Sequence, residues 1–233
     1  MMKRRAAYGT VTFSALFCLL SIFGLSEMIQ KAALAQSTPE SAEENEFSRG
    51  VQAVKDKNFQ LALNLFETAA FRSEYEAQYN LGYLLRHGKG RPQNYAEALY
   101  WVLLAQLGGI ELAEELAEEI EGKLTEKQLE PVLEKVALHL ENRIETGEFE
   151  AIPQLAYYYH GLLPEADYEQ SYLWYAIAVA LNLPEVMDLR DEMEDEVEPE
   201  RIAVLQTQTT DIFNRLLAGG PIRQKKTEAA NEN

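Results

Sequence analysis

The stretch AQYNLGYLLRHGKGRPQNYAEALYWVLLAQLGG, residues 77–109, decides the fold of this chain. Its first part has a helical period that ends at Gly88, where Gly90 and Pro92 stop and turn the chain. Between Tyr95 and Leu107, apolar side chains recur every three or four residues and form one stripe along a second helix. The stretch therefore predicts two helices, over 76–87 and 95–107, joined by a glycine-rich turn.

The same plan occurs earlier in the chain. Gly50 is followed by Ala62 twelve residues later, and these small residues allow the helices predicted over 46–56 and 59–71 to approach closely. In the quoted stretch, Gly82 and Ala98 play these parts at a spacing of sixteen residues. Such small-residue spacing in paired helices resembles the tetratricopeptide pattern.

A second copy of the plan appears when the chain is aligned with itself at an offset of 73. Gly88 then aligns with Gly161, His87 with His160, and Trp101 with Trp174. This offset predicts a tandem duplication of a four-helix unit, over 77–146 and 150–217, in an all-α array of roughly ten helices. At this offset Gly82 aligns with Leu155, so the alignment of the second copy around Leu155 could be shifted by one residue. Helices are also predicted over 111–121, with Leu112, Leu116 and Ile120 on the apolar face, and over 125–146, with a kink or break at Pro131 and Thr125 as N-cap.

The motif Leu-Gly-x5-Gly-x-Gly, followed by Asn-Tyr-x-x-Ala and a second helix containing tryptophan, resembles the SEL-one-like repeat, a relative of the tetratricopeptide repeat with a longer turn. It departs from the family pattern at Leu85, where the family favours tyrosine, and at Arg91, where it favours an aliphatic residue. The resemblance implies an α-solenoid that acts as a scaffold or regulator through protein contacts, as periplasmic family members do in envelope signalling and exopolysaccharide production. The residues that carry it are Leu81, Gly82, Gly88, Gly90, Ala98, Trp101 and Ala105.

The first 35 residues have the layout of a secretory signal peptide. Lys3, Arg4 and Arg5 precede fifteen apolar residues, and Ala33-Leu34-Ala35 offers a cleavage site. An uncleaved membrane anchor is the alternative, but fifteen helical residues span only about 22 Å of a hydrocarbon core of about 30 Å. Cys18, the only cysteine, lies in the apolar run, so the mature chain is expected to contain neither a disulfide nor a thiolate metal site.

Removal of the leader takes away four basic residues and one acidic residue. The remaining chain then has 17 basic and 37 acidic residues, a net charge of −20. A basic footprint for nucleic acid or for an anionic membrane surface is not expected on such a chain. We therefore predict a protein or peptide partner, no nucleic acid partner and no stable insertion into a membrane.

The sequence contains no motif of the common hydrolases, nucleotide-binding proteins or zinc enzymes, so we predict a protein that is not an enzyme and needs no cofactor or metal. His87 and His160 adjoin the predicted helix ends, where a histidine can bind the last carbonyl oxygens. Two acidic segments, 111–121 and 188–200, flank helical apolar stripes and are interpreted as solvated faces. Trp101 and Trp174 are assigned to the core.

The best candidates for recognition lie on the first helix of each hairpin, which lines the concave face of tetratricopeptide-like arrays. Counted from Gly82, the positions that point there are −3, +1, +4 and +5. In the second copy the same register gives Ile152, Ala156, Tyr159 and His160. Tyrosine and arginine suit recognition because they offer a large contact area with a polar end, although each tyrosine could instead pack between hairpins. The predicted surface therefore comprises Tyr79, Tyr83, Arg86, His87, Tyr159 and His160.

The predicted organisation is a signal peptide over 1–35, a polar linker over 36–46, the helical repeat domain over 47–218 and a disordered tail over 219–233. The expected location is the periplasm. Two other functions stay open: an accessory protein that binds peptidoglycan or another polysaccharide, and a membrane-tethered scaffold if the leader is not cleaved. The structural repeat positions are Gly50, Gly82, Gly88, Gly90, Ala98, Trp101, Gly161 and Trp174.

Overall fold

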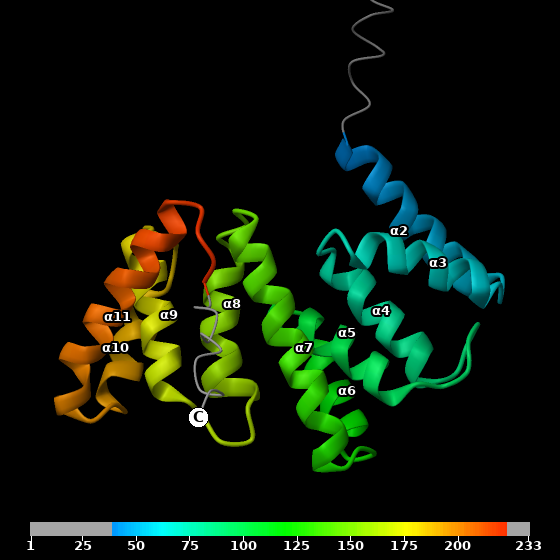
Figure 1. The fold of residues 1–233 in the computed structure, drawn as a ribbon. Coiled ribbons are helices and arrows are strands. Elements are labelled where there is room, and N and C mark those ends of the chain that lie inside the picture. Colours follow the sequence, from blue (N-terminus) through cyan, green and yellow to red (C-terminus); the bar gives the residue numbers. More distant parts are fainter. Residues whose placement is uncertain (1–38, 223–233) are drawn as a thin grey trace, which may run out of the picture. The chain divides into compact units, whose positions relative to one another are not determined.

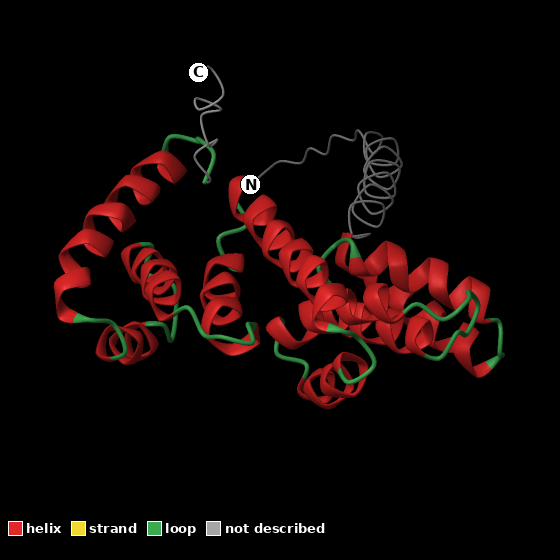
Figure 2. Cartoon of the chain, turned by 60° about the horizontal axis from the view of Figure 1, so that its bottom comes forward, coloured by secondary structure: helices red, strands yellow, loops and turns green. Residues whose placement is uncertain are grey.

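The computed structural model describes residues 39–222, and within this range every regular element is a helix (Figure 2). The predicted signal peptide and residues 223–233 of the predicted tail lie outside the described residues. The chain divides into two units, 1–48 and 49–233, with the boundary inside the first helix. None of the described helices has both the length and the apolar character needed to cross a bilayer.

The ten described α-helices confirm the predicted all-α, tetratricopeptide-like array (Figure 1). One π-helical turn, η1 (Tyr158–Leu162), follows the seventh helix of the series. The α-helices are α2 (Pro39–Lys55), α3 (Phe59–Ala70), α4 (Tyr75–Arg86), α5 (Tyr95–Leu107), α6 (Glu111–Glu121), α7 (Glu126–Glu145), α8 (Ala151–Tyr157), α9 (Tyr168–Ala180), α10 (Met187–Asp195) and α11 (Pro199–Leu217). In each copy the second helix is central: α5 packs on α4, α6 and α7, and α9 packs on α8, α10 and α11.

Helix α2 begins earlier than predicted and takes in most of the predicted linker. It starts at Pro39, whereas we expected a helix only from residue 46. Proline is favoured at the first helical position because its fixed φ suits a helix and its missing N–H is not needed there. The alanine and glutamates that follow are good helix formers, so a polar segment without an apolar period can still be helical.

The duplication is visible in the helix boundaries. Helix α9 begins and ends at an offset of 73 from α5, and α11 begins at the same offset from α7. The N-caps repeat as well: the Asn94 side chain accepts a hydrogen bond from the Glu97 N–H at 3.1 Å, and the Asp167 side chain accepts one from the Gln170 N–H at 3.0 Å. The predicted units therefore correspond to α4–α7 and α8–α11, each starting its second helix in the same way.

The predicted repeat positions of the first two hairpins lie at close helix contacts and in turns. Ala98 and Trp101 are buried, as is Trp174 of α9. A Cβ atom on Gly82 would lie 2.5 Å from Val102 Cγ2 and 3.0 Å from the Ala98 carbonyl oxygen, so only glycine fits this close approach. The other three glycines serve contact or turn geometry: Gly50 lies against the Phe66 ring, and Gly88 and Gly90 have φ of +63° and +85°.

Two details of the middle helices differ from the prediction. Leu112 is 63% exposed, because the buried stripe of α6 is Ala113, Leu116, Ala117 and Ile120. Helix α7 is one helix from Glu126 to Glu145 with Pro131 inside it, so the proline does not break it. Pro131 lies near the start of α7, and the buried side chains that follow it hold the helix against its neighbours. Thr125 and Gln128 form the predicted N-terminal cap as a capping box.

A polar chain joins the two copies. Arg143 of α7 donates from Nη1 to Gln154 Oε1 of α8 at 2.8 Å, and Gln154 Nε2 donates to the Tyr75 hydroxyl oxygen at 2.8 Å. Because Tyr75 begins α4, Gln154 of α8 links the first helix of the second copy both to the first helix of the first copy and to α7. It fixes the position of α8 beside α7, where the second copy starts.

The described chain ends beside α7. The predicted tail begins at residue 219, but Ile222 is buried and its N–H donates to Glu145 Oε1 at 2.8 Å. Its carbonyl oxygen accepts from Arg215 at 3.3 Å. Ile222 is therefore held against the repeat domain, although it lies within the range predicted as the tail.

Candidate recognition surface

The outer side of α4 carries an ordered pair of aromatic rings. Tyr83 is 36% exposed, and the His87 ring stacks on it with centroids 4.2 Å apart. His87 Nδ1 lies 2.9 Å from the Tyr83 carbonyl oxygen, which is the predicted role of a histidine at a helix end. The Lys89 ammonium lies 5.4 Å from the centroid of the Tyr83 ring on the same surface. Together these contacts hold an exposed tyrosine in one orientation.

The other two predicted residues of this face are less accessible. Tyr79 is partly buried, and burial, followed by the nearby Tyr83 and Glu115, raises its pKa. The Arg86 side chain is only 15% exposed and forms an ion pair with Glu119 of α6. Its guanidinium also lies over the Tyr95 ring, 5.2 Å from the centroid. Arg86 therefore joins α4 to α5 and α6. Its guanidinium, which we predicted to contact a partner, is paired within the protein.

In α8 the second copy is offset from the first by 74, one more than the 73 that relates α9 to α5. Ser171 of α9 is the counterpart of Ala98, and its hydroxyl donates to the carbonyl oxygen of Ala156 at 3.0 Å. Ala156 thus occupies the place of Gly82, against the same helix at the same level. The burial pattern agrees, because Leu155 and Ala156 are buried as Leu81 and Gly82 are. The slip left open in the sequence is real, and it arises because the second copy has a turn one residue shorter.

The corrected register changes the second half of the predicted surface. Ile152 and Ala156, which we placed on the open face, are fully buried. Tyr157 takes the place of Tyr83 and is 39% exposed, against 36% for its counterpart. Tyr159 corresponds to the buried Leu85 and does not belong to this face. Sequence reasoning missed Tyr157 because three consecutive tyrosines give no signal that distinguishes one register from another.

His160 repeats the arrangement of His87 with a different partner set. Its ring packs edge-on to Tyr157 with centroids 5.0 Å apart. Its Nδ1 lies 3.2 Å from the Ala156 carbonyl oxygen and 2.9 Å from Ser171 Oγ. Both copies therefore present an exposed tyrosine against a histidine that is bound to the carbonyl four residues before it. We call Tyr83–His87 and Tyr157–His160 the aromatic pairs.

Gly161 has a different structural role from the predicted one. It aligns with Gly88 in sequence, but it lies within η1 and has no positive φ. A Cβ atom there would lie 2.7 Å from the Tyr157 ring. Glycine is needed at 161 so that the Tyr157 side chain can lie back over the π-helical turn, which is a contact and not a helix stop.

Nothing in these groups has the form of a catalytic site. Ser171 and His160 are at the distance of a nucleophile and a base, but Ser171 is fully buried and its hydroxyl is bound to Ala156. Across residues 39–222, no group of three or more histidines, cysteines or carboxylates could hold a metal ion. The acidic residues of 111–121 and 188–200 are mostly exposed, as expected for solvated helix faces.

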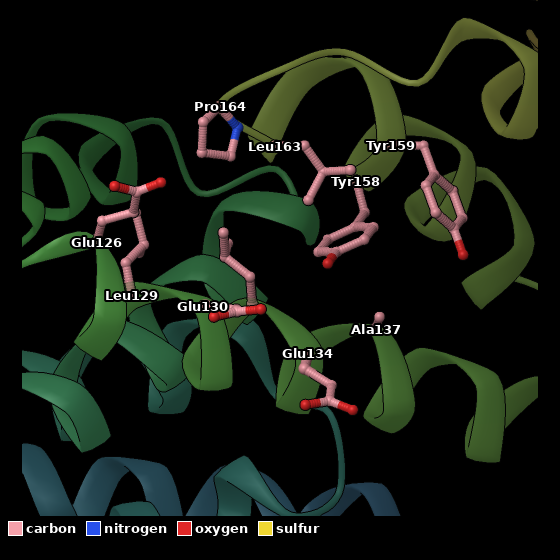
Figure 3. A pocket seen from close by; sticks show the side chains of 10 residues that line it. Glu126, Leu129, Glu130, Glu134, Ala137, Tyr158, Tyr159, Leu163 and Pro164 are labelled. Carbon is pink, nitrogen blue, oxygen red and sulfur yellow. The ribbon is translucent and has the colours of Figure 1, made fainter.

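A groove lies between the two copies, where α7 faces η1 (Figure 3). Its cavity has a volume of about 620 Å³. Tyr159, which we had placed on the open face, lines this groove together with Tyr158, Leu163 and Pro164. Across from them, α7 contributes Glu126, Leu129, Glu130, Leu133, Glu134 and Ala137. No local pattern in the sequence indicates the groove, because its two walls are more than twenty residues apart and belong to different copies.

Comparison with known proteins agrees with these repeats. The family model of the Sel1 repeat matches residues 47–70, 76–105 and 151–183. The second match contains nearly all of the α4–α5 hairpin and the third contains the α8–α9 hairpin, while the first ends with α3. No curated protein matches the chain closely enough to count as a relative.

Proposed function

Because the chain is a Sel1-repeat protein, we propose that it is exported to the periplasm, where it binds a peptide or protein partner as a non-enzymatic scaffold or regulator of the cell envelope. Sel1 repeats indicate a scaffold for protein–protein interaction. Arrays of this type stack their helical hairpins and leave an extended surface for a partner. Export and the envelope role rest on the leader-like first 35 residues and on the family resemblance.

The observation that supports a partner most directly is the pair of exposed tyrosines at equivalent places in the two copies. Each tyrosine is held by a histidine that is itself bound to its own helix. An aromatic side chain that is already ordered loses little conformational entropy when a partner covers it. Tyrosine also contributes large apolar area and a hydroxyl, the combination that is common at the centre of interfaces.

The proposal can be tested by placing a photo-crosslinking amino acid at position 83 or 157 in the organism that makes the protein. Positions 112 and 187 are matched controls, because Leu112 and Met187 are also exposed apolar side chains but lie on α6 and α10. We expect the same protein adduct at 83 and 157 and none at the controls. Equal labelling at all four sites, or no adduct at 83 and 157, would contradict an interaction through the aromatic pairs.

The intact mass of the purified protein tests the export step. Loss of residues 1–35 supports a periplasmic protein, and retention of these residues would instead support the membrane-tethered alternative.

If the array binds peptidoglycan, the protein will sediment with purified cell-wall sacculi and the variant Tyr83→Ala/Tyr157→Ala will not. That result, without a protein adduct, would favour the polysaccharide accessory.

A further inference from the structure

The groove between the copies has an uncompensated acidic wall. Glu126, Glu130 and Glu134 follow one another at intervals of four along α7, so their Cα atoms rise by about 6 Å each along one side of the helix. Among residues 39–222, none of these three carboxylates has a hydrogen bond or ion pair, and all three are exposed. The groove therefore attracts cations.

The opposite wall and the floor are apolar and aromatic. Figure 3 shows Tyr158 and Leu163 turned toward α7, across from the glutamates. Leu129, Leu133 and Ala137 complete the lining on the α7 side. A ligand that fits this groove therefore has cationic side chains along one edge and aliphatic groups that can pack on the apolar wall. Lysine and arginine combine the two, because their aliphatic chains pack while their charged ends reach a carboxylate.

The described chain ends on this same helix. The backbone of Ile222 is bound by Glu145, eleven residues after Glu134. At 100° per residue, eleven residues bring Glu145 back to within about 20° of Glu134, about 16 Å along α7. Leu138, 47% exposed, lies between them on nearly the same face. A continuous strip of α7 thus leads from the end of the described chain to the groove.

The residues that follow Ile222 have the required charge. Arg223, Lys225 and Lys226 place three cations within four residues. Four extended residues span at most about 14 Å, and the lysine side chain adds to this reach. Lys226 can therefore reach Glu134 from the position of Ile222, and the residues after it can cover the rest of the strip.

We propose that the segment Arg223–Lys226 docks along α7, with its lysines in the groove lined by Glu130 and Glu134 and by Tyr158 and Leu163. The segment is tethered, so its effective concentration at the groove is on the order of millimolar. An outside partner with the same basic character has to displace it. This intramolecular contact goes beyond the proposed function and holds whether or not the aromatic pairs bind a partner.

Disulfide trapping tests the contact in the full chain, because Cys18→Ser leaves no other cysteine. In that background, Glu134→Cys with Lys226→Cys is compared with Glu118→Cys with Lys226→Cys, since Glu118 is an exposed glutamate of α6 outside the groove. We expect the intramolecular disulfide of the first pair to form on the order of tenfold faster, because docking raises the local concentration of the thiol introduced at position 226. Equal rates would overturn the proposal.

A charge swap then tests the cause. Arg223→Glu/Lys225→Glu, added to the Glu134→Cys/Lys226→Cys chain, is expected to lower the trapping rate to that of the control. Further addition of Glu126→Lys/Glu130→Lys is expected to restore it. Trapping that is insensitive to these changes overturns a charge-driven contact, and disulfides that form only between two chains overturn an intramolecular one. Circular dichroism of each variant confirms that the repeat domain is folded.

Discussion

The Ser171 hydroxyl donates a hydrogen bond to the carbonyl oxygen of Ala156 at 3.0 Å across the α8–α9 hairpin. In the first copy, Gly82 lies against the carbonyl oxygen of Ala98 and the side chain of Val102. The two copies therefore solve one packing problem in two ways. The first uses glycine, which leaves room for a carbonyl oxygen and a valine side chain. The second uses alanine, whose carbonyl oxygen accepts a hydrogen bond from the serine hydroxyl.

Gly82→Leu is expected to destabilise the first copy strongly, and Gly82→Ala to cost about 1–3 kcal/mol, the usual cost of overpacking a close contact. The added Cβ meets Val102 and the Ala98 carbonyl, and backbone cannot move aside as a flexible side chain can. Gly122→Ala is the matched control, because a Cβ there lies no closer than 3.6 Å to another atom. Urea denaturation measures both; equal midpoints for Gly82→Ala and Gly122→Ala would refute the close approach.

Ser171→Ala is expected to lower the free energy of unfolding by about 1–3 kcal/mol, because the variant loses the hydrogen bonds to the Ala156 carbonyl oxygen and to His160, and each buried hydrogen bond has a net value of about 0.5–1.5 kcal/mol. The loss is moderate because His160 Nδ1 also lies 3.2 Å from the same carbonyl oxygen. Thr207→Ala provides the control, since the Thr207 hydroxyl donates to the Ala203 carbonyl on an exposed part of α11. A stability equal to that of the parent protein in both variants would show that the hydroxyl of Ser171 does not hold the hairpin.

Arg86 is expected to affect stability and not recognition. It pairs with Glu119 and lies over Tyr95, so Arg86→Ala removes an ion pair and packing between three helices. A double-mutant cycle with Glu119→Ala should give a coupling energy of about 0.5–1 kcal/mol, as for partly exposed ion pairs. Crosslinking from position 83 should persist in Arg86→Ala. Loss of the adduct without any change in melting would instead return Arg86 to the recognition surface.

Stability at alkaline pH should depend on two buried tyrosines. Burial raises the pKa of Tyr100 to about 12, and burial, followed by Tyr157 and Glu192, raises that of Tyr175 to about 12. An unfolded tyrosine titrates near pH 10. From about pH 10 to 12 the unfolded chain therefore loses protons that the folded chain keeps, and the free energy of unfolding falls as the pH rises. Below pH 10 these groups cause no change.

The matched measurement uses Tyr100→Phe/Tyr175→Phe, which removes both hydroxyls. We expect its stability, relative to that at pH 9, to decline less steeply above pH 10 than that of the parent protein. A pKa difference of this size corresponds to about 2–3 kcal/mol per tyrosine at most. In a titration followed by phenolate absorbance, the step at the highest pH should also be absent from the variant. Parallel curves for the two proteins would exclude a role for buried hydroxyls in the alkaline transition.

Much of the architecture followed from local patterns. The ends of α5 and α6 agree with the predicted ranges at every residue, because an apolar stripe, an N-cap such as Asn94 and a terminal glycine are all near each other in the chain. The start of α2 was missed because the prediction relied on apolar stripes, and this polar segment has none. The tandem duplication could also be predicted, because residues separated by a fixed offset of 73 are of the same type.

The candidate site was less predictable because exposure and pairing depend on neighbours from elsewhere in the chain. Tyr83 and His87 share one helix surface, since residues four apart in a helix lie on the same side. The ion pair of Arg86 could not be foreseen, because its partner, Glu119, is 33 residues away. Tyr157 was overlooked and Tyr159 chosen, because one residue fewer in a turn rotates every side chain of α8 by about 100° relative to α9.

The sequence by itself determined the repeat, the helix-forming segments and the close contacts at Gly50 and Gly82, because helical periodicity and residue size act over short stretches of chain. Only the tertiary structure decided which side chain of each helix is exposed, where η1 meets α7, and that Ile222 is bound at Glu145 on the same helix. These features depend on the packing angle and register of whole helices. The energy of that packing is shared among residues that are distant in sequence, so no local pattern records it. The stretch 77–109 therefore fixes the fold, while the surface that a partner meets is set by how its hairpin packs against the rest of the array.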